Sequence, residues 1–222
     1  MEMIGSGKNK SPLIKRLLFF TLILLALVGI SSIASEWIPN QRAENKIGVV
    51  DITGLISDSE HIVNQVKKFG ADKRIRGIVL RIDSPGGSVG PSQEIYDEVL
   101  KTRKGGKVIY ASMGALAASG GYYIASAAEK IFANPGTLTG SIGVIMAFAN
   151  AKGLMEKIGL QPQVIKAGKY KDIGSPARVM TQKEKNLLQS VVVDVHQQFI
   201  EAVASGRDIS VAEVTKIADG RI

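Results

Sequence analysis

Residues 113–128 constrain the fold more than any other stretch of this chain. One serine, Ser119, stands there between residues with almost no side chain, in Met-Gly-Ala-Leu-Ala-Ala-Ser-Gly-Gly-Tyr-Tyr-Ile-Ala-Ser-Ala-Ala. Glycine and alanine let the backbone turn sharply and let other backbone approach closely. Residues 122–128 are apolar and alanine-rich, which predicts a buried helix with Ser119 near its N-terminus. Ser119 is then either a reactive serine at a strand-to-helix turn or a helix N-cap.

Strands and helices are predicted in alternation from residue 46 onward. Runs of β-branched residues predict strands at 46–54, 76–83, 107–112, 130–133 and 163–167, and within 137–146 the residues 141–144 are predicted to be extended. Helical spacing predicts helices over 59–69, from Pro91, and over 151–158. A capping box at Thr181 and Glu184 opens a long helix with an apolar stripe, which ends near Gly206. This alternation is typical of an α/β protein with a largely parallel sheet.

Composition excludes several kinds of site. The chain has no cysteine, which excludes thiolate catalysis, Cys-based zinc sites and disulfides. The formal net charge is +8, and the first sixteen residues contribute +3 of it. Elsewhere Lys and Arg do not cluster with aromatic residues, so we expect no nucleic-acid partner.

The N-terminal part predicts a membrane anchor. Residues 17–35 are uncharged, rich in Leu, Ile and Phe, and preceded by Lys15 and Arg16. At about 1.5 Å per residue this run just spans a bilayer. The basic flank places residues 1–16 in the cytoplasm and the domain at 46–222 on the other side of the inner (cytoplasmic) membrane, with 36–45 as a linker. A cleaved signal peptide is the alternative, because Ser32-Ile33-Ala34 resembles a cleavage site.

A serine nucleophile needs a base, and the chain offers two histidines and a group of lysines. His61 and His196 both lie on predicted helices as partly exposed residues, which argues against a Ser-His-Asp triad. Lys166, Lys169 and Lys171 lie in a predicted loop region. An isolated lysine has a pKa of about 10.4, and lowering it to near 8 takes about 3 kcal/mol, which burial supplies. Three solvated loop lysines are the alternative interpretation.

A second glycine-rich turn follows the strand at 76–83. Ser84-Pro85-Gly86-Gly87 offers free backbone N–H groups, which suit an oxyanion hole facing the serine turn. A phosphate loop is disfavoured because neither a Gly-Lys-Ser/Thr ending nor GxGxxG spacing is present. A plain tight turn is the remaining alternative.

Four motifs in this order closely resemble the signal peptide peptidase A family of the Clp-protease/crotonase superfamily. They are Asp-Ser-Pro-Gly-Gly (83–87), Ala-Ala-Ser-Gly-Gly-Tyr-Tyr (117–123), Gly-Thr-Leu-Thr-Gly-Ser-Ile-Gly-Val (136–144) and Lys-Tyr-Lys-Asp-Ile-Gly-Ser-Pro (169–176). The resemblance runs from about Ile47 to the end. It implies a fold of repeated strand-strand-helix units, a homo-oligomer, and a reaction without cofactor or metal.

The same resemblance implies roles for individual residues. Ser119 would be the nucleophile and Lys171 the general base, and Ser141 would hold the lysine amine by a hydrogen bond. The backbone N–H groups of Gly86 and Gly120 would form the oxyanion hole. Gly87 is the alternative to Gly86.

The implied function is a membrane-anchored serine endopeptidase that cleaves signal-peptide remnants or other extended apolar peptides. Such a peptide would pair as an added strand with residues 87–89 and 142–144. A related protease of one specific membrane protein is an alternative, and so is a non-proteolytic crotonase-like protein that binds acyl-coenzyme A or acts as a scaffold. The family continues into another strand and helix beyond residues 218–222, so we expect a C-terminally truncated or short version.

Overall fold

The computed structural model describes the backbone of residues 12–37 and 45–222, and the side chains of residues 16–30 and 45–222. The chain divides into two compact units, residues 1–44 and residues 45–222. The first unit contains helix α1 (Pro12–Trp37), whose described apolar side chains, such as those of Leu17 and Phe20, are exposed. Within the described part of the chain, no helix has both the length and the apolarity required to cross a membrane.

Parts of the N-terminal predictions lie outside the described residues. These parts are residues 1–11 of the basic N-terminus and residues 38–44 of the linker, together with the side chains of residues 31–35 at the end of the predicted span. The membrane anchor over 17–35 therefore stays a prediction.

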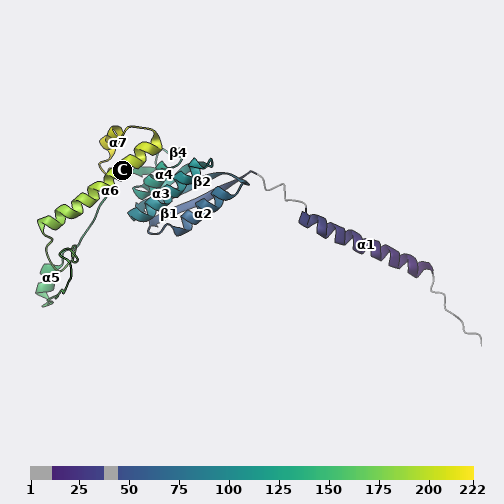
Figure 1. Cartoon of the computed structure of the whole chain (residues 1–222), viewed down its shortest axis with the longest axis horizontal. Coiled ribbons are helices and arrows are strands. Elements are labelled where there is room, and N and C mark those ends of the chain that lie inside the picture. The colour runs from purple at the N-terminus through teal and green to yellow at the C-terminus, as the bar shows by residue number, and fades with distance from the viewer. Residues whose placement is uncertain (1–11, 38–44) are drawn as a thin grey trace, which may run out of the picture. The chain divides into compact units, whose positions relative to one another are not determined.

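The second unit alternates strands and helices along the chain (Figure 1). In order its elements are β1 (Lys46–Ile56), α2 (Glu60–Ala71), β2 (Ile75–Gly87), α3 (Val89–Lys104), β3 (Val108–Ala118), α4 (Gly120–Ser126), β4 (Lys130–Phe132), β5 (Leu138–Gly140), α5 (Lys152–Lys157), α6 (Gln182–Arg207) and α7 (Val211–Ile217).

The strands form one sheet in the order β1-β2-β3-β4, and β5 pairs with β3 beyond the end of β4. The pairs β1–β2, β2–β3, β3–β4 and β3–β5 are all parallel. The predicted α/β class with a largely parallel sheet is therefore confirmed. This architecture fits a Clp-protease-like fold.

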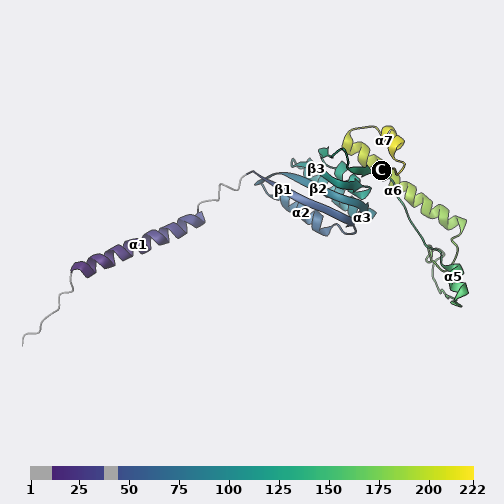
Figure 2. The same cartoon turned by 180° about the vertical axis from the view of Figure 1, so that it is seen from behind.

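Helices α2, α3 and α4 pack on one face of the sheet, as the two opposite views show (Figures 1 and 2). Residues alternate along β1, where Val50 and Ile52 are buried and Val49 is exposed. The buried residues of the strands meet Ile95 and Val99 on the inward face of α3. Burying such a side chain contributes roughly 1.5–3 kcal/mol, so this layer fixes the strand ends that carry the glycine turns.

A second, smaller core joins the last part of the chain to α4. Its buried residues include Phe199 and Val203 of α6 and Val214 of α7. Tyr122 and Tyr123 of α4 pack against both cores. Helix α4, which follows Ser119 directly, is therefore held between the sheet and α6.

Three strands end later than the sequence predicted, β1 by two residues and β2 and β3 by more. Strand β2 continues through residues 84–87, which we predicted as a turn, because Leu55 and Ile56 of β1 pair with Gly86 and Gly87 after a register shift. Strand β3 continues to Ala118 because its last residues pair with β5. Strands β2 and β3 therefore both run directly to the serine turn.

The prediction of a strand at 163–167 is wrong. This segment has no regular secondary structure, and Val164 and Ile165 are exposed, because no neighbouring strand is available to pair with them. Within residues 137–146 the described strand is β5, and the predicted extended segment at 141–144 follows it without forming a strand.

The capping box of α6 is confirmed, but only part of its apolar stripe is buried. Phe199 is buried, whereas Leu187 and Val191 are exposed. The N-terminal half of α6 extends beyond the sheet (Figure 1), so its stripe faces no core. Helix α7 was not predicted, although its own capping box, Ser210 with Glu213, was a usable signal.

Candidate active site

Ser119 forms a sharp turn between β3 and α4. Its backbone has φ 52° and ψ −121°, a region that residues other than glycine rarely adopt and that costs on the order of 1–3 kcal/mol. Its N–H donates to the carbonyl of Gly140 (2.9 Å), and its carbonyl accepts from Tyr123 N–H (2.8 Å). Within the described residues its hydroxyl makes no capping bond to α4. The turn therefore presents a free hydroxyl, and the N-cap interpretation is not supported.

Backbone around Ser119 is packed so closely that only glycine fits. A Cβ on Gly86, whose φ is +95°, would lie 2.5 Å from the nitrogen of Gly120 and 2.8 Å from Cβ of Ser119. A Cβ on Gly120 would lie 2.5 Å from Oγ of Ser92. The two glycine motifs thus meet at the serine, as an oxyanion hole requires.

The amides of the first glycine motif differ in their bonding. The N–H of Gly86 donates to Oγ of Ser84 (3.1 Å), and that hydroxyl donates to the carbonyl of Gly54 (2.6 Å). Ser84 is fully buried, so this arrangement is shielded from water. The amide of Gly86 therefore already has a partner within its own turn, which bears on the choice between Gly86 and the predicted alternative, Gly87.

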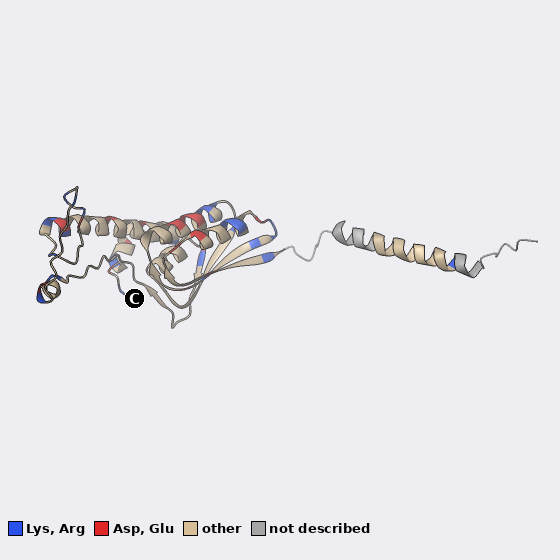
Figure 3. Cartoon of the chain, turned by 90° about the horizontal axis from the view of Figure 1, so that it is seen from below, with Lys and Arg blue, Asp and Glu red and all other residues tan. Residues whose placement is uncertain are grey.

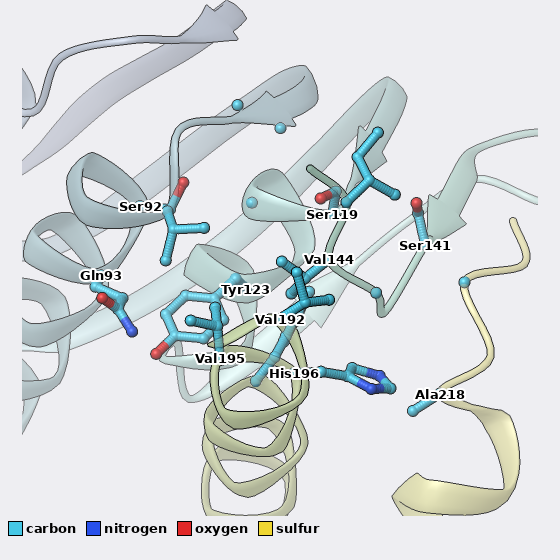
Figure 4. A pocket seen from close by; sticks show the side chains of 18 of the residues that line it. Ser92, Gln93, Ser119, Tyr123, Ser141, Val144, Val192, Val195, His196 and Ala218 are labelled. Carbon is cyan, nitrogen blue, oxygen red and sulfur yellow. The ribbon is translucent and has the colours of Figure 1, made fainter. Parts of the chain in front are cut away.

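Ser119 lies on the wall of a cavity of about 650 Å³ (Figure 4). Ser141, which follows β5, lies on the same wall, next to the serine turn through the pairing of Ala118 with Gly140. Gly86, Gly87 and Gly120 supply backbone, and α6 and the segment after β5 supply apolar side chains, among them Val144, Val192, Val195 and Phe199. Polar side chains, including those of Gln93, Gln189 and Asp219, line other parts of the cavity. The apolar part of the wall suits a bound chain with apolar side chains.

Tyr123 forms part of this cavity and is fixed between two other rings. Its ring centroid lies 4.7 Å from that of Tyr96 and 5.0 Å from that of Phe199. Burial raises the pKa of Tyr123 to about 12, so its hydroxyl stays protonated at neutral pH. Tyr123 therefore shapes the cavity and is not a candidate base.

The two histidines have structural partners. His61 is exposed on α2 and its ring contacts Gln65 (2.8 Å). His196 lines the cavity, but its Nε2 lies 3.2 Å from the carbonyl of Ile142, and a carbonyl can only accept, so this nitrogen carries the hydrogen. Figure 4 shows the His196 ring directed towards Ala218 and away from Ser119. Neither histidine is placed to activate the serine.

The three candidate lysines lie in the region between α5 and α6 and differ in their contacts. Lys166 is paired with Asp172, and Lys169 lies over the ring of Tyr170 at 5.4 Å. Lys171 is exposed, and its side chain has no hydrogen bond or ion pair with another described residue. Lys171 is therefore the lysine that is free to act, but it does not line the cavity of Ser119. Figure 1 shows its region at the outer end of α6, away from α4.

Comparison with known proteins identifies the family. The sequence profile of peptidase family S49 matches residues 101–222, which include Ser119, Ser141 and Lys171. The chain belongs to peptidase family S49. A Synechocystis protein whose name marks it as an inferred protease is 42% identical over 84% of this chain and 67% of its own length.

Two other S49-like relatives carry more specific names. A protein of Enterococcus faecium, named as an inferred signal peptide peptidase, is 35% identical over 87% of this chain and 60% of its own length. Protease 4 of Haemophilus influenzae is 33% identical over 80% of this chain and 30% of its own length. The resemblance to signal peptide peptidases seen in the sequence is thereby confirmed. This S49 chain spans only part of the length of each of the three relatives, from 67% down to 30%.

Sequence reasoning missed two groups in this S49 site. In the apolar wall from α6, Val195 was predicted only as part of an apolar stripe and Val192 was not singled out, because a helical period does not reveal what a helix faces. Arg178 donates hydrogen bonds to Asp172, the residue after Lys171, and to Glu184. Its position between these two acidic residues was the one feature of the sequence that could have indicated this role. Among the described residues, no group of acidic or histidine side chains gathers as metal ligands.

The Gly86→Ala variant tests the close approach of the two glycine motifs. We expect peptide cleavage to fall by about 10²–10³-fold, since a displaced Gly120 amide no longer supports the oxyanion, and stability to fall by roughly 1–2 kcal/mol from the positive φ alone. Initial rates and thermal melting measure the two effects. Gly90→Ala is the matched control, because a Cβ there meets no atom within 4 Å. Wild-type cleavage by Gly86→Ala would contradict this assignment of the turn.

Proposed function

We propose that this chain is a serine endopeptidase that cleaves extended apolar peptides with a Ser119–Lys171 dyad. The observation that carries the proposal is the strained turn at Ser119, which presents an uncapped hydroxyl on a cavity walled by glycine backbone and apolar side chains. Membership of peptidase family S49 supports a peptidase reaction.

In the proposed mechanism, the neutral amine of Lys171 takes the proton of Ser119 Oγ while this oxygen attacks the peptide carbonyl carbon. Backbone N–H groups of Gly120 and of Gly87, or of Gly86, donate to the oxyanion that forms. The lysine then gives its proton to the leaving amine, and an acyl-serine ester remains. A water that loses a proton to the same lysine attacks the ester carbon. As the bond from this carbon to Ser119 Oγ breaks, the lysine returns the proton to Oγ, and the carboxylic acid is released.

We propose further that the lysine comes from a second copy of the chain. Lys171 does not line the cavity of its own Ser119, and it is exposed and unpaired in the described part of the chain. Exposed apolar side chains before it, including Ile145, Ile158 and Ile165, offer a surface for such a copy. Burial of Lys171 against the apolar cavity would favour its neutral amine, with Ser141 as hydrogen-bond partner.

Signal-peptide remnants are the proposed substrates, and residues 17–35 are the proposed single-pass anchor. A peptide could pair with the backbone of residues 87–89 and 142–144, where its apolar side chains would meet Val144 and Val192. An anchor in the cytoplasmic membrane, with the domain on its outer side, would keep the cavity near peptides released into that membrane. The name of the Enterococcus relative supports this substrate class.

Incubation with a synthetic signal peptide tests the function. We expect internal cleavage at apolar positions, detected by mass spectrometry, and little cleavage of a charged peptide of equal length. Binding of acyl-coenzyme A without cleavage of any peptide would contradict the proposal and favour a non-proteolytic role.

A further inference from the structure

A cluster of charges ties the region of Lys171 to the first turn of α6. The carboxylate of Asp172, the next residue along the chain, accepts from Arg178 at Nε (2.8 Å) and at Nη2 (3.0 Å). The same guanidinium donates from Nη1 to Oε2 of Glu184 (2.9 Å). Lys166 contacts the same carboxylate, at Oδ1 of Asp172. Figure 3 shows Lys and Arg (blue) and Asp and Glu (red) close to one another along the ribbon where α6 begins.

Glu184 anchors this cluster to the helix. Its side chain is only 5% exposed, and it accepts from the backbone N–H of Thr181 (2.8 Å) in the capping box. The hydrogen bond from Arg178 is the main reason that the pKa of Glu184 falls to about 2. Arg178 likewise holds the pKa of Asp172 well below its usual range. Both carboxylates are therefore charged at neutral pH, and the guanidinium is their common partner.

The backbone on either side of Lys171 is also fixed on its own chain. The N–H of Lys171 donates to the carbonyl of Gly168 (3.2 Å), and that of Ile173 to the carbonyl of Tyr170 (3.1 Å). Gly174 packs so tightly on Phe148 that a Cβ there would lie 2.5 Å from its ring. The lysine side chain is thus exposed on a backbone that has a defined conformation.

We infer that Arg178 is a positioning residue, which sets the direction of Lys171 by clamping Asp172 to Glu184 on α6. This inference rests on the proposed function, in which Lys171 is the general base. Such a clamp matters most if Lys171 acts on the serine of another subunit. In that case the chain that carries Lys171 must itself orient the lysine, because the serine belongs to the other chain. A misplacement of about 1 Å can cost a catalytic group on the order of 10²-fold in rate.

Replacing the guanidinium tests the clamp. We expect Arg178→Gln to lower kcat by about 10- to 100-fold with KM changed less than about twofold, since substrate contacts are untouched. Arg178→Lys should recover only part of the loss, because one ammonium cannot bridge both carboxylates. Lys183→Gln, the control, removes one positive charge from the first turn of α6 beside Glu184 and is expected to behave as wild type.

A double variant separates positioning from general damage. In the Lys171→Ala background, Arg178→Gln should cause no further loss in the rate at which a serine-acylating probe labels Ser119. An equal loss in both backgrounds would overturn the inference, and so would a rise in KM with unchanged kcat. If Arg178→Gln melts early or fails to fold, Asp172→Asn, which keeps the side-chain shape, replaces it. Asp172→Asn must then lower the labelling rate in the wild-type background and cause no further loss in the Lys171→Ala background.

The outcome also distinguishes this inference from the proposed function. Full activity of Lys171→Ala would show that Lys171 is not the general base, and the proposed function would fail. Loss of activity in Lys171→Ala together with wild-type kcat in Arg178→Gln would overturn the clamp alone.

Discussion

Ser119→Ala is expected to abolish peptide cleavage, with a loss of about 10⁴-fold or more in kcat, as for the removal of a serine nucleophile elsewhere. The variant removes only the hydroxyl oxygen, which caps no helix and makes no hydrogen bond among the described residues. Folding should therefore be unchanged. The measurements are initial rates of cleavage, thermal melting, and labelling by a serine-acylating probe followed by peptide mapping.

Ser205→Ala is the control for this variant, since Ser205 is exposed on α6 and does not line the cavity. It should cleave and be labelled as wild type. Labelling that persists in Ser119→Ala would show that the nucleophile is another residue. The strained turn at Ser119 would then have no catalytic role.

Lys171→Ala is expected to lower kcat by about 10²–10⁴-fold, the usual contribution of a general acid–base group. The loss should appear both in cleavage and in acylation of Ser119 by the probe, because the same lysine is needed to deprotonate the hydroxyl. Lys169→Ala is the matched control from the same region, since Lys169 lies over Tyr170. A lysine variant with undiminished cleavage would defeat the assigned base.

Mixing the two inactive variants decides where the lysine comes from. If Lys171 acts on the serine of another copy, co-assembly of Ser119→Ala with Lys171→Ala chains should restore about one quarter of wild-type activity, because random association pairs an intact serine with an intact lysine at that frequency. Restored activity should appear only under conditions that allow subunit exchange. A mixture that stays inactive in proven mixed assemblies would mean that both groups act within one chain.

The local features of this protein were determined by its sequence. The small residues around Ser119 predicted a sharp turn between strand and helix, and the structure has that turn with a positive φ. The capping box of Thr181 and Glu184 predicted where α6 begins. Such features depend on φ preferences and on hydrogen bonds between near neighbours, which a few consecutive residues specify.

Features that depend on distant partners were decided only by the tertiary structure. Residues 163–167 have the composition of a strand but find no strand to pair with, and the apolar stripe of α6 is buried only where the second core reaches it. The bond from the Gly86 amide to Ser84, which bears on the choice between Gly86 and Gly87, could not be seen in the motif alone. The separation of Lys171 from the cavity of Ser119 has the same origin. The sequence determines which chemical groups the chain carries and the local turns and helix ends around them. Long-range packing determines which of these groups lie next to one another.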